Sequence, residues 1–199
     1  MGLVKDQPVE PADAVVLMES SGPYQTLPFD ELADFQRNSL VRRILLIEDR
    51  SSRIVRLGIV PTVEVILRRE LRTRGVPEDA LETLAYTDDY PSGVHCLRDW
   101  LQENPDSRVT LLCGELHSRT TAWVLGTVLE PEQIERVRVR PVPDTRFTTA
   151  NWWHSRQGIV HLFGEYVVLL HTMAFDASVK ERQWDPDEYE QNMRQLTGI

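Results

Sequence analysis

The residues best suited to chemistry come directly after one predicted strand. His117, Ser118 and Arg119 follow the apolar run at 108–113 and open a stretch with helical spacing. A helix N-terminus presents free backbone N–H groups and the positive end of the helix dipole, so it attracts anions. These residues would therefore bind phosphate or carboxylate, with His117 as an acid or base near neutral pH. The alternative is that His117 caps the helix and Arg119 pairs with a surface acid.

A second candidate pair lies after the last predicted strand. Asp144 and Arg146 stand in the sequence Pro-Val-Pro-Asp-Thr-Arg at 141–146. Its prolines favour a stiff, extended loop that would hold Arg146 over a ligand. The alternative is an Asp–Arg pair that closes a turn.

Two aromatic residues and one carboxylate complete the candidates. Trp152 and Trp153 precede the most apolar stretch of the chain, which contains Glu165. A tandem Trp pair most often packs a helix against a sheet, and the functional alternative is a stacking wall for a ring-bearing ligand. A carboxylate within an apolar helix needs a partner, either an Arg with a structural role or a ligand site.

The sequence lacks the common motifs for metals and nucleotides. It contains no Cys-x-x-Cys, His-x-x-x-His, Walker loop or Gly-x-Gly-x-x-Gly, so we predict no metal site. Its two cysteines, Cys96 and Cys113, are too few for a disulfide framework. We interpret them as small buried residues of a protein in a reducing compartment.

Strand and helix patterns alternate along the chain. Short apolar runs predict strands at 14–18, 43–48, 83–86, 108–113 and 136–140, and apolar periodicity predicts helices at 29–38, 61–74, 92–103, 117–129 and 158–173. We interpret the last of these as a buried core helix. The alternation predicts an α/β fold with a mainly parallel five-stranded sheet. Ligands of such sheets bind beyond the carboxyl ends of the strands, here at 19–22, 48–50, 87–89, 115–119 and 143–146.

Composition sets the broad class. The chain has 199 residues with 31 acidic and 22 basic side chains, a net charge of −9 that argues against nucleic-acid or anionic-membrane binding. No signal peptide or membrane span is visible, so a cytoplasmic location is expected. We divide the chain into an N-terminal tail at 1–11, one α/β domain at 12–175, and an acidic tail at 176–199 with a short helix near 187–196.

The second half of the chain resembles the YdcF-like family, the SanA and ElyC group, which is classed as a domain of unknown function. The resemblance covers residues 108–173. It rests on four segments in order: Leu-His-Ser-Arg at 116–119, Pro-Val-Pro-Asp-Thr-Arg at 141–146, Trp-Trp-His-Ser-Arg at 152–156, and Glu-Tyr at 165–166. It implies a Rossmann-like three-layer sandwich with a ligand at the strand ends. It also implies a nucleotide-like or phosphorylated ligand, with S-adenosylmethionine as one proposal for the family, and a link to cell-envelope biogenesis.

Two functions follow from this reading. The first is binding of a small anionic or nucleotide-like molecule by Ser118, Arg119, Asp144, Arg146, Trp152 and Trp153, with His117 as the residue for any catalysis. The second is a degenerate, non-catalytic protein that acts through protein partners or as a homodimer. The second rests on the first half, where Glu-Ser-Ser-Gly-Pro at 19–23 replaces the Gly-rich turn of the family. Its interaction surfaces would be the Arg-rich stretch at 42–74 and the acidic tail.

Overall fold

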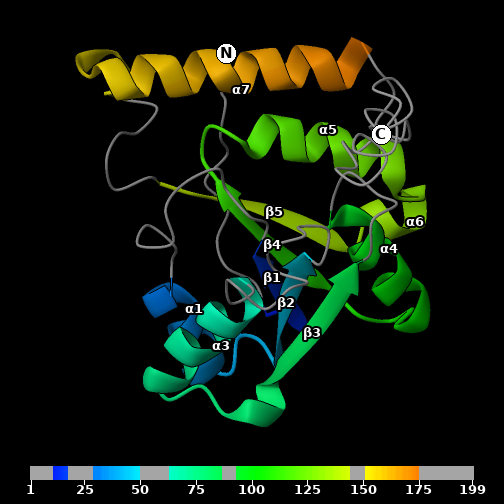
Figure 1. The fold of residues 1–199 in the computed structure, drawn as a ribbon. Helices are drawn as coiled ribbons and strands as arrows, with labels where there is room; N and C mark the ends of the chain where they lie inside the picture. The colour runs from blue at the N-terminus through cyan, green and yellow to red at the C-terminus, as the bar shows by residue number, and fades with distance from the viewer. Residues whose placement is uncertain (1–10, 18–28, 50–62, 87–92, 144–150, 175–199) are drawn as a thin grey trace, which may run out of the picture.

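The computed structural model describes residues 11–17, 29–49, 63–86, 93–143 and 151–174. Its centre is a single sheet in which every neighbouring pair of strands is parallel, in the order β3-β2-β1-β4-β5 (Figure 1). The strands are β1 (Ala14–Leu17), β2 (Arg43–Asp49), β3 (Leu81–Tyr86), β4 (Val109–Gly114) and β5 (Val137–Val142). The predicted five strands are confirmed, and the sheet is wholly parallel.

Helices cover both faces of this sheet and make a three-layer α/β/α sandwich. They are α1 (Phe29–Arg37), α3 (Val63–Thr73), α4 (Val94–Glu103), α5 (Ser118–Val128), the short α6 (Pro131–Ile134) and α7 (Arg156–Ala174), with 3-10 turns η2 (Glu78–Ala80) and η3 (Trp152–His154). α1 and α3 share a core cluster with one face of the sheet, and α4 and α5 share a second cluster with the other. The predicted fold class is therefore confirmed.

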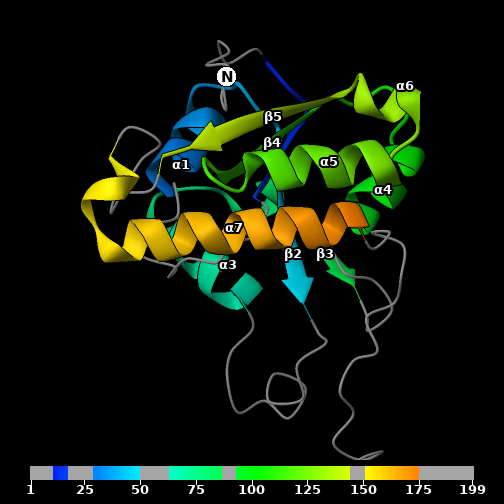
Figure 2. The same ribbon diagram turned by 90° about the horizontal axis from the view of Figure 1, so that it is seen from above.

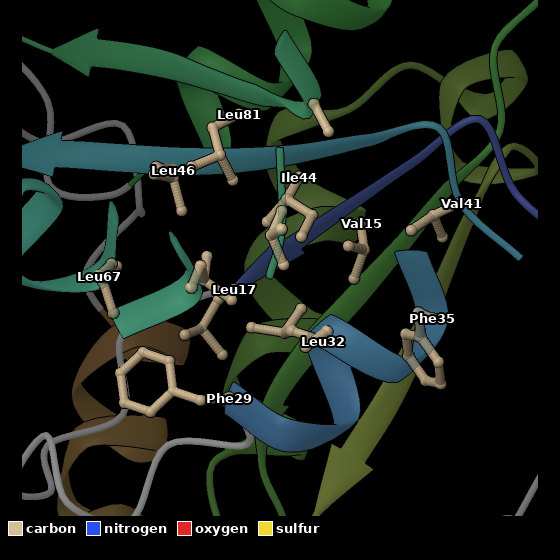
Figure 3. Packing of buried hydrophobic residues seen from close by; sticks show 14 of the residues in the cluster. Val15, Leu17, Phe29, Leu32, Phe35, Val41, Ile44, Leu46, Leu67 and Leu81 are labelled. Atoms are coloured by element: carbon tan, nitrogen blue, oxygen red, sulfur yellow. The ribbon is translucent and has the colours of Figure 1, made fainter. Parts of the chain in front are cut away.

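Successive side chains of a strand point to opposite faces of the sheet, so one sheet contributes side chains to two cores. Val15 and Leu17 of β1 point into the cluster under α1 and α3, whereas Ala14 and Val16 point into the cluster under α4 and α5. Figure 3 shows the first cluster, in which Phe29 and Leu32 of α1 lie beside Leu17. A strand buried on both faces reads as a continuous apolar run, and Ala-Val-Val-Leu at 14–17 is such a run.

The strand order places a switch point between β1 and β4. From β1 the chain order proceeds through β2 and β3 to one edge of the sheet, whereas β4 and β5 fill the other side. Ligands of open parallel sheets bind at the carboxyl ends of the two strands where this direction reverses. The residues that follow β4 are Glu115, Leu116 and His117, so the candidate His117 lies beside the switch point.

Two helices end in the same backbone motif but with different residues at its left-handed position. In α1 the N–H of Leu40 donates to the carbonyl of Phe35, and Ser39 has φ 56°. In α3 the N–H of Val76 donates to the carbonyl of Leu71, and Gly75 has φ 86°. Both are Schellman endings, for which glycine is the favoured residue. The helix predicted to end at residue 74 ends at Thr73, and Gly75 takes the left-handed position that follows.

We expect Ser39→Gly to raise the free energy of unfolding by about 1 kcal/mol and Gly75→Ser to lower it by a similar amount. The side chain of Ser39 is exposed, and no heavy atom lies within 4 Å of a Cβ built on Gly75, so backbone conformation alone sets both effects. Urea denaturation of the two variants measures them. If both variants change the free energy of unfolding in the same direction, the left-handed backbone conformation does not set their stability.

The prediction of a buried core helix at 158–173 is wrong. α7 forms, but it lies on the outer side of α5, with α5 between it and the sheet (Figures 1 and 2). Only Gly158 and Glu165 of this helix are buried. A run that is apolar on all sides indicates a helix but does not say which side faces the protein. None of the helices within the described ranges is long and apolar enough to cross a membrane.

Candidate functional site

The turn between β4 and α5 carries the candidate histidine. His117 occupies the residue before α5, but its side chain makes no capping hydrogen bond. Its backbone carbonyl instead accepts from the N–H and the hydroxyl of Thr121, at 3.0 and 3.1 Å. Ser118 is buried and donates its hydroxyl to the carbonyl of Glu115 at 2.7 Å. The capping alternative for His117 is therefore wrong, and its imidazole is available for another partner.

That partner is Glu165 from α7, forty-eight positions along the chain. Nδ1 of His117 lies 2.7 Å from Oε2 of Glu165. Because an ionised carboxylate only accepts hydrogen bonds, Nδ1 carries the proton of this bond. His161, one turn earlier on α7, places its Nε2 3.7 Å from the other oxygen of Glu165. Glu165 thus has an imidazole near each oxygen, so among the described residues its partners are two histidines and not the Arg that was one of the two alternatives.

The environment keeps Glu165 ionised. Burial of the carboxyl raises its pKa. The hydrogen bond from His117 and the charges of His117 and His161 lower the pKa, and their combined effect is larger than that of burial. The net pKa of Glu165 therefore lies below the ordinary value. The side chain of Glu165 is 8% exposed, whereas that of His117 is 25% exposed. The carboxylate is thus buried, and the imidazole to which it is hydrogen-bonded is partly exposed to solvent.

This arrangement gives the imidazole a defined chemistry. A carboxylate on Nδ1 fixes the tautomer, so that Nε2 is the nitrogen left to accept or donate a proton. The same division of roles, in which a carboxylate orients a histidine, is found in hydrolase triads. Ser118, the residue next to this histidine, is not placed as a nucleophile, because it donates its hydroxyl to the carbonyl of Glu115. The pair His117–Glu165 is therefore suited to proton transfer or to hydrogen bonding of an anion.

Arg119 adds positive charge at the same turn. It lies in the first turn of α5, where its side chain is exposed. Within the described ranges, no carboxylate forms an ion pair with it. The alternative that Arg119 pairs with a surface acid is thus unsupported among those residues. A guanidinium at a helix N-terminus favours the binding of an anion.

The remaining predicted site residues divide into two groups. Asp144 and Arg146 lie outside the described residues, as do the strand-end segments at 19–22 and 87–89. Trp152 is half-buried in η3 and Trp153 is 51% exposed, with their rings in a T-shaped contact at 5.7 Å. The interpretation that this pair packs a helix against the sheet is therefore not supported for the exposed Trp153. A stacking role for either ring stays a prediction.

Several other potentially reactive side chains are buried or paired within the chain. Burial raises the pKa of the Cys113 thiol to about 11, despite an opposing hydrogen bond with Thr121, so it is not a ready nucleophile. Cys96 is only half-buried. Arg68 and Arg74, from the Arg-rich stretch, bind Glu64 and Asp30 of their own chain. No cluster of His, Cys, Asp and Glu among the described residues is arranged to hold a metal ion.

Sequence reasoning did not assign His161 as a partner of Glu165. The spacing of His161 and Glu165, one helical turn apart, is the signal that could have identified it. The pairing of Glu165 with His117 has no such local signal, because it joins the start of one helix to the middle of another. Comparison of the chain with protein-family models, with curated proteins and with solved structures found no significant match.

Proposed function

We propose that this protein binds a small anionic molecule at the carboxyl ends of β1 and β4, and that His117 exchanges a proton with it. The observation that carries the proposal is the 2.7 Å bond from His117 to the buried Glu165. A carboxylate that fixes one nitrogen of a partly exposed imidazole prepares the other for a ligand.

Three further features support an anionic ligand. The switch point of the sheet lies beside His117. The first turn of α5 presents backbone N–H groups, and Arg119 projects from that turn. The resemblance to the YdcF-like family leads to the same ligand class, a phosphorylated or nucleotide-like molecule.

A ligand panel with matched variants tests the proposal. Thermal unfolding is measured with inorganic phosphate, sugar phosphates, common nucleotides and S-adenosylmethionine. A ligand at a hundredfold excess over its dissociation constant stabilises the folded state by about 2.7 kcal/mol. We expect Arg119→Ala to weaken binding about tenfold or more, as loss of a charge-assisted contact does. Arg69→Ala, which removes an exposed arginine on α3, is the control and should bind as the wild type does.

The proton role has its own readout. The imidazole resonances of His117 should shift when the ligand binds, and the pH dependence of binding should change in Glu165→Gln, which keeps the shape of the side chain but loses its charge. Binding that is equal in the wild type and Arg119→Ala would place the ligand elsewhere. No binding of any panel member would count against an anion site.

A further inference from the structure

The outward face of α7 is more apolar than the face that packs on the protein. Glu165 and Gly158 are the buried residues of this helix, whereas eight large apolar side chains are exposed by 39% to 69%, and all of these but Val168 lie on the side away from Glu165. We call these seven the α7 face: Ile159, Val160, Phe163, Tyr166, Val167, Leu170 and Met173. Figures 1 and 2 show α7 along the outer side of α5, and the elements that it mainly contacts among those described are α5 and η3. Such a reversal of polarity marks an interaction surface.

The spacing within the α7 face is that of a helix–helix seam. Val160, Phe163, Val167 and Leu170 follow one another at intervals of three, four and three residues. Two apolar positions in every seven is the repeat with which α-helices pack lengthwise against one another. The nineteen residues of α7 extend for roughly 28 Å. The face is therefore a continuous stripe suited to another helix.

We infer that a second copy of this chain covers the α7 face with its own α7 face. From their exposed fractions, the seven side chains present roughly 700 Å² to solvent, more than the largest patch of a typical monomer at about 300–600 Å². A stable interface buries roughly 800 Å² on each partner. One apolar helix face from each of two copies thus supplies most of a standard interface.

The charge pattern favours a second copy over other occupants. Between Arg156 and the end of α7, the only acidic or strongly basic side chain is Glu165, which points inward. A helix that lies on an anionic lipid surface carries several Lys and Arg residues beside its apolar face, whereas α7 has a single one, Arg156, at its first residue. A two-fold interface, in contrast, needs only a face that is complementary to itself. This inference does not depend on the proposed function.

Sedimentation velocity of the full chain tests the inference. We expect the wild type to sediment as a dimer of the 23.0 kDa chain at micromolar concentration. Val167→Glu adds a charge at the centre of the face and should raise the dimer dissociation constant at least about 100-fold, because association would bury two unpaired carboxylates. Val65→Glu is the matched control: Val65 is 50% exposed on α3, compared with 63% for Val167, and this variant should remain a dimer. Circular dichroism confirms that both variants are folded.

Two results would overturn the inference. If the wild type stays monomeric up to about 100 µM, no second copy covers the α7 face. This result would overturn the inference even if lipid vesicles or residues 175–199 of the same chain were then found to cover the face. A dimer that persists in both Val167→Glu and Phe163→Glu would place its interface elsewhere. Loss of the dimer in Val167→Glu but not in Val65→Glu supports the inference.

Discussion

His117→Ala should lower the free energy of unfolding at pH 7 by about 2 kcal/mol, because it leaves the Glu165 carboxylate without its closest donor. A hydrogen bond to a charged group contributes roughly 1.5–3 kcal/mol, and a buried charge that loses its partner bears the cost of its own desolvation. The side chain of Glu165 is 8% exposed, so water replaces the imidazole poorly. Urea denaturation measures the loss.

The loss should depend on pH with a definite sign. In the wild type the pKa of Glu165 is lowered, so its contribution is present above the ordinary glutamate pKa and declines as the pH falls through the lowered value. Without His117, burial becomes the dominant influence and raises that pKa. Stability from this group is then present at low pH and declines as the pH rises. The difference between wild type and variant should therefore be full at pH 7 and should shrink as the pH falls below the ordinary glutamate pKa.

His161→Ala provides the control on the same carboxylate. Its Nε2 is 3.7 Å from Glu165 and its side chain is 27% exposed, so we expect a loss below about 1 kcal/mol. If His117→Ala costs the same stability at pH 4 and pH 7, the loss comes from packing and not from the carboxylate.

The layered fold could be predicted because its signals are local. The run at 14–17 is apolar at every position, as a strand between two helical layers must be, and Gly75 with Pro77 two residues later marks the end of α3. The boundaries of the helices and strands were predicted less accurately than their existence. The third strand begins at Leu81 and not at 83, because Leu81 and Glu82 already pair with Ile44 and Leu45.

The site could be predicted only in part, because its geometry depends on contacts between distant segments. His117 and Arg119 were identifiable from their position after an apolar run. That Glu165 would meet His117 depends on which side of α7 faces α5, and a helix with apolar residues on every side does not reveal this. The single carboxylate decides the orientation: facing inward it gains the imidazole of His117, in addition to His161 on its own helix. The apolar residues on the opposite side are exposed as a consequence.

The start of α7 fixes where Glu165 lies, and Gly158 is the residue on which that start depends. The hydroxyl of Ser155 accepts the N–H of Gly158 at 2.9 Å, which is an N-terminal cap. A Cβ at residue 158 would lie 2.3 Å from the backbone carbonyl oxygen of Trp152 and 3.0 Å from the Ser155 hydroxyl. Because the carbonyl belongs to the backbone of η3, relief requires the helix and η3 to move apart.

Gly158→Ala should therefore lower the free energy of unfolding by about 2 kcal/mol, although alanine favours helix by up to about 1 kcal/mol over glycine. Gly164→Ala is the matched control on the same helix: no heavy atom lies within 4 Å of its Cβ, so it should raise stability by about 0.5–1 kcal/mol. Urea denaturation at one protein concentration compares the two. Gly158→Ala should also shift the imidazole resonances of His117, since Glu165 lies on the displaced helix. Equal stabilisation by both alanines would mean that η3 does not set the position of α7.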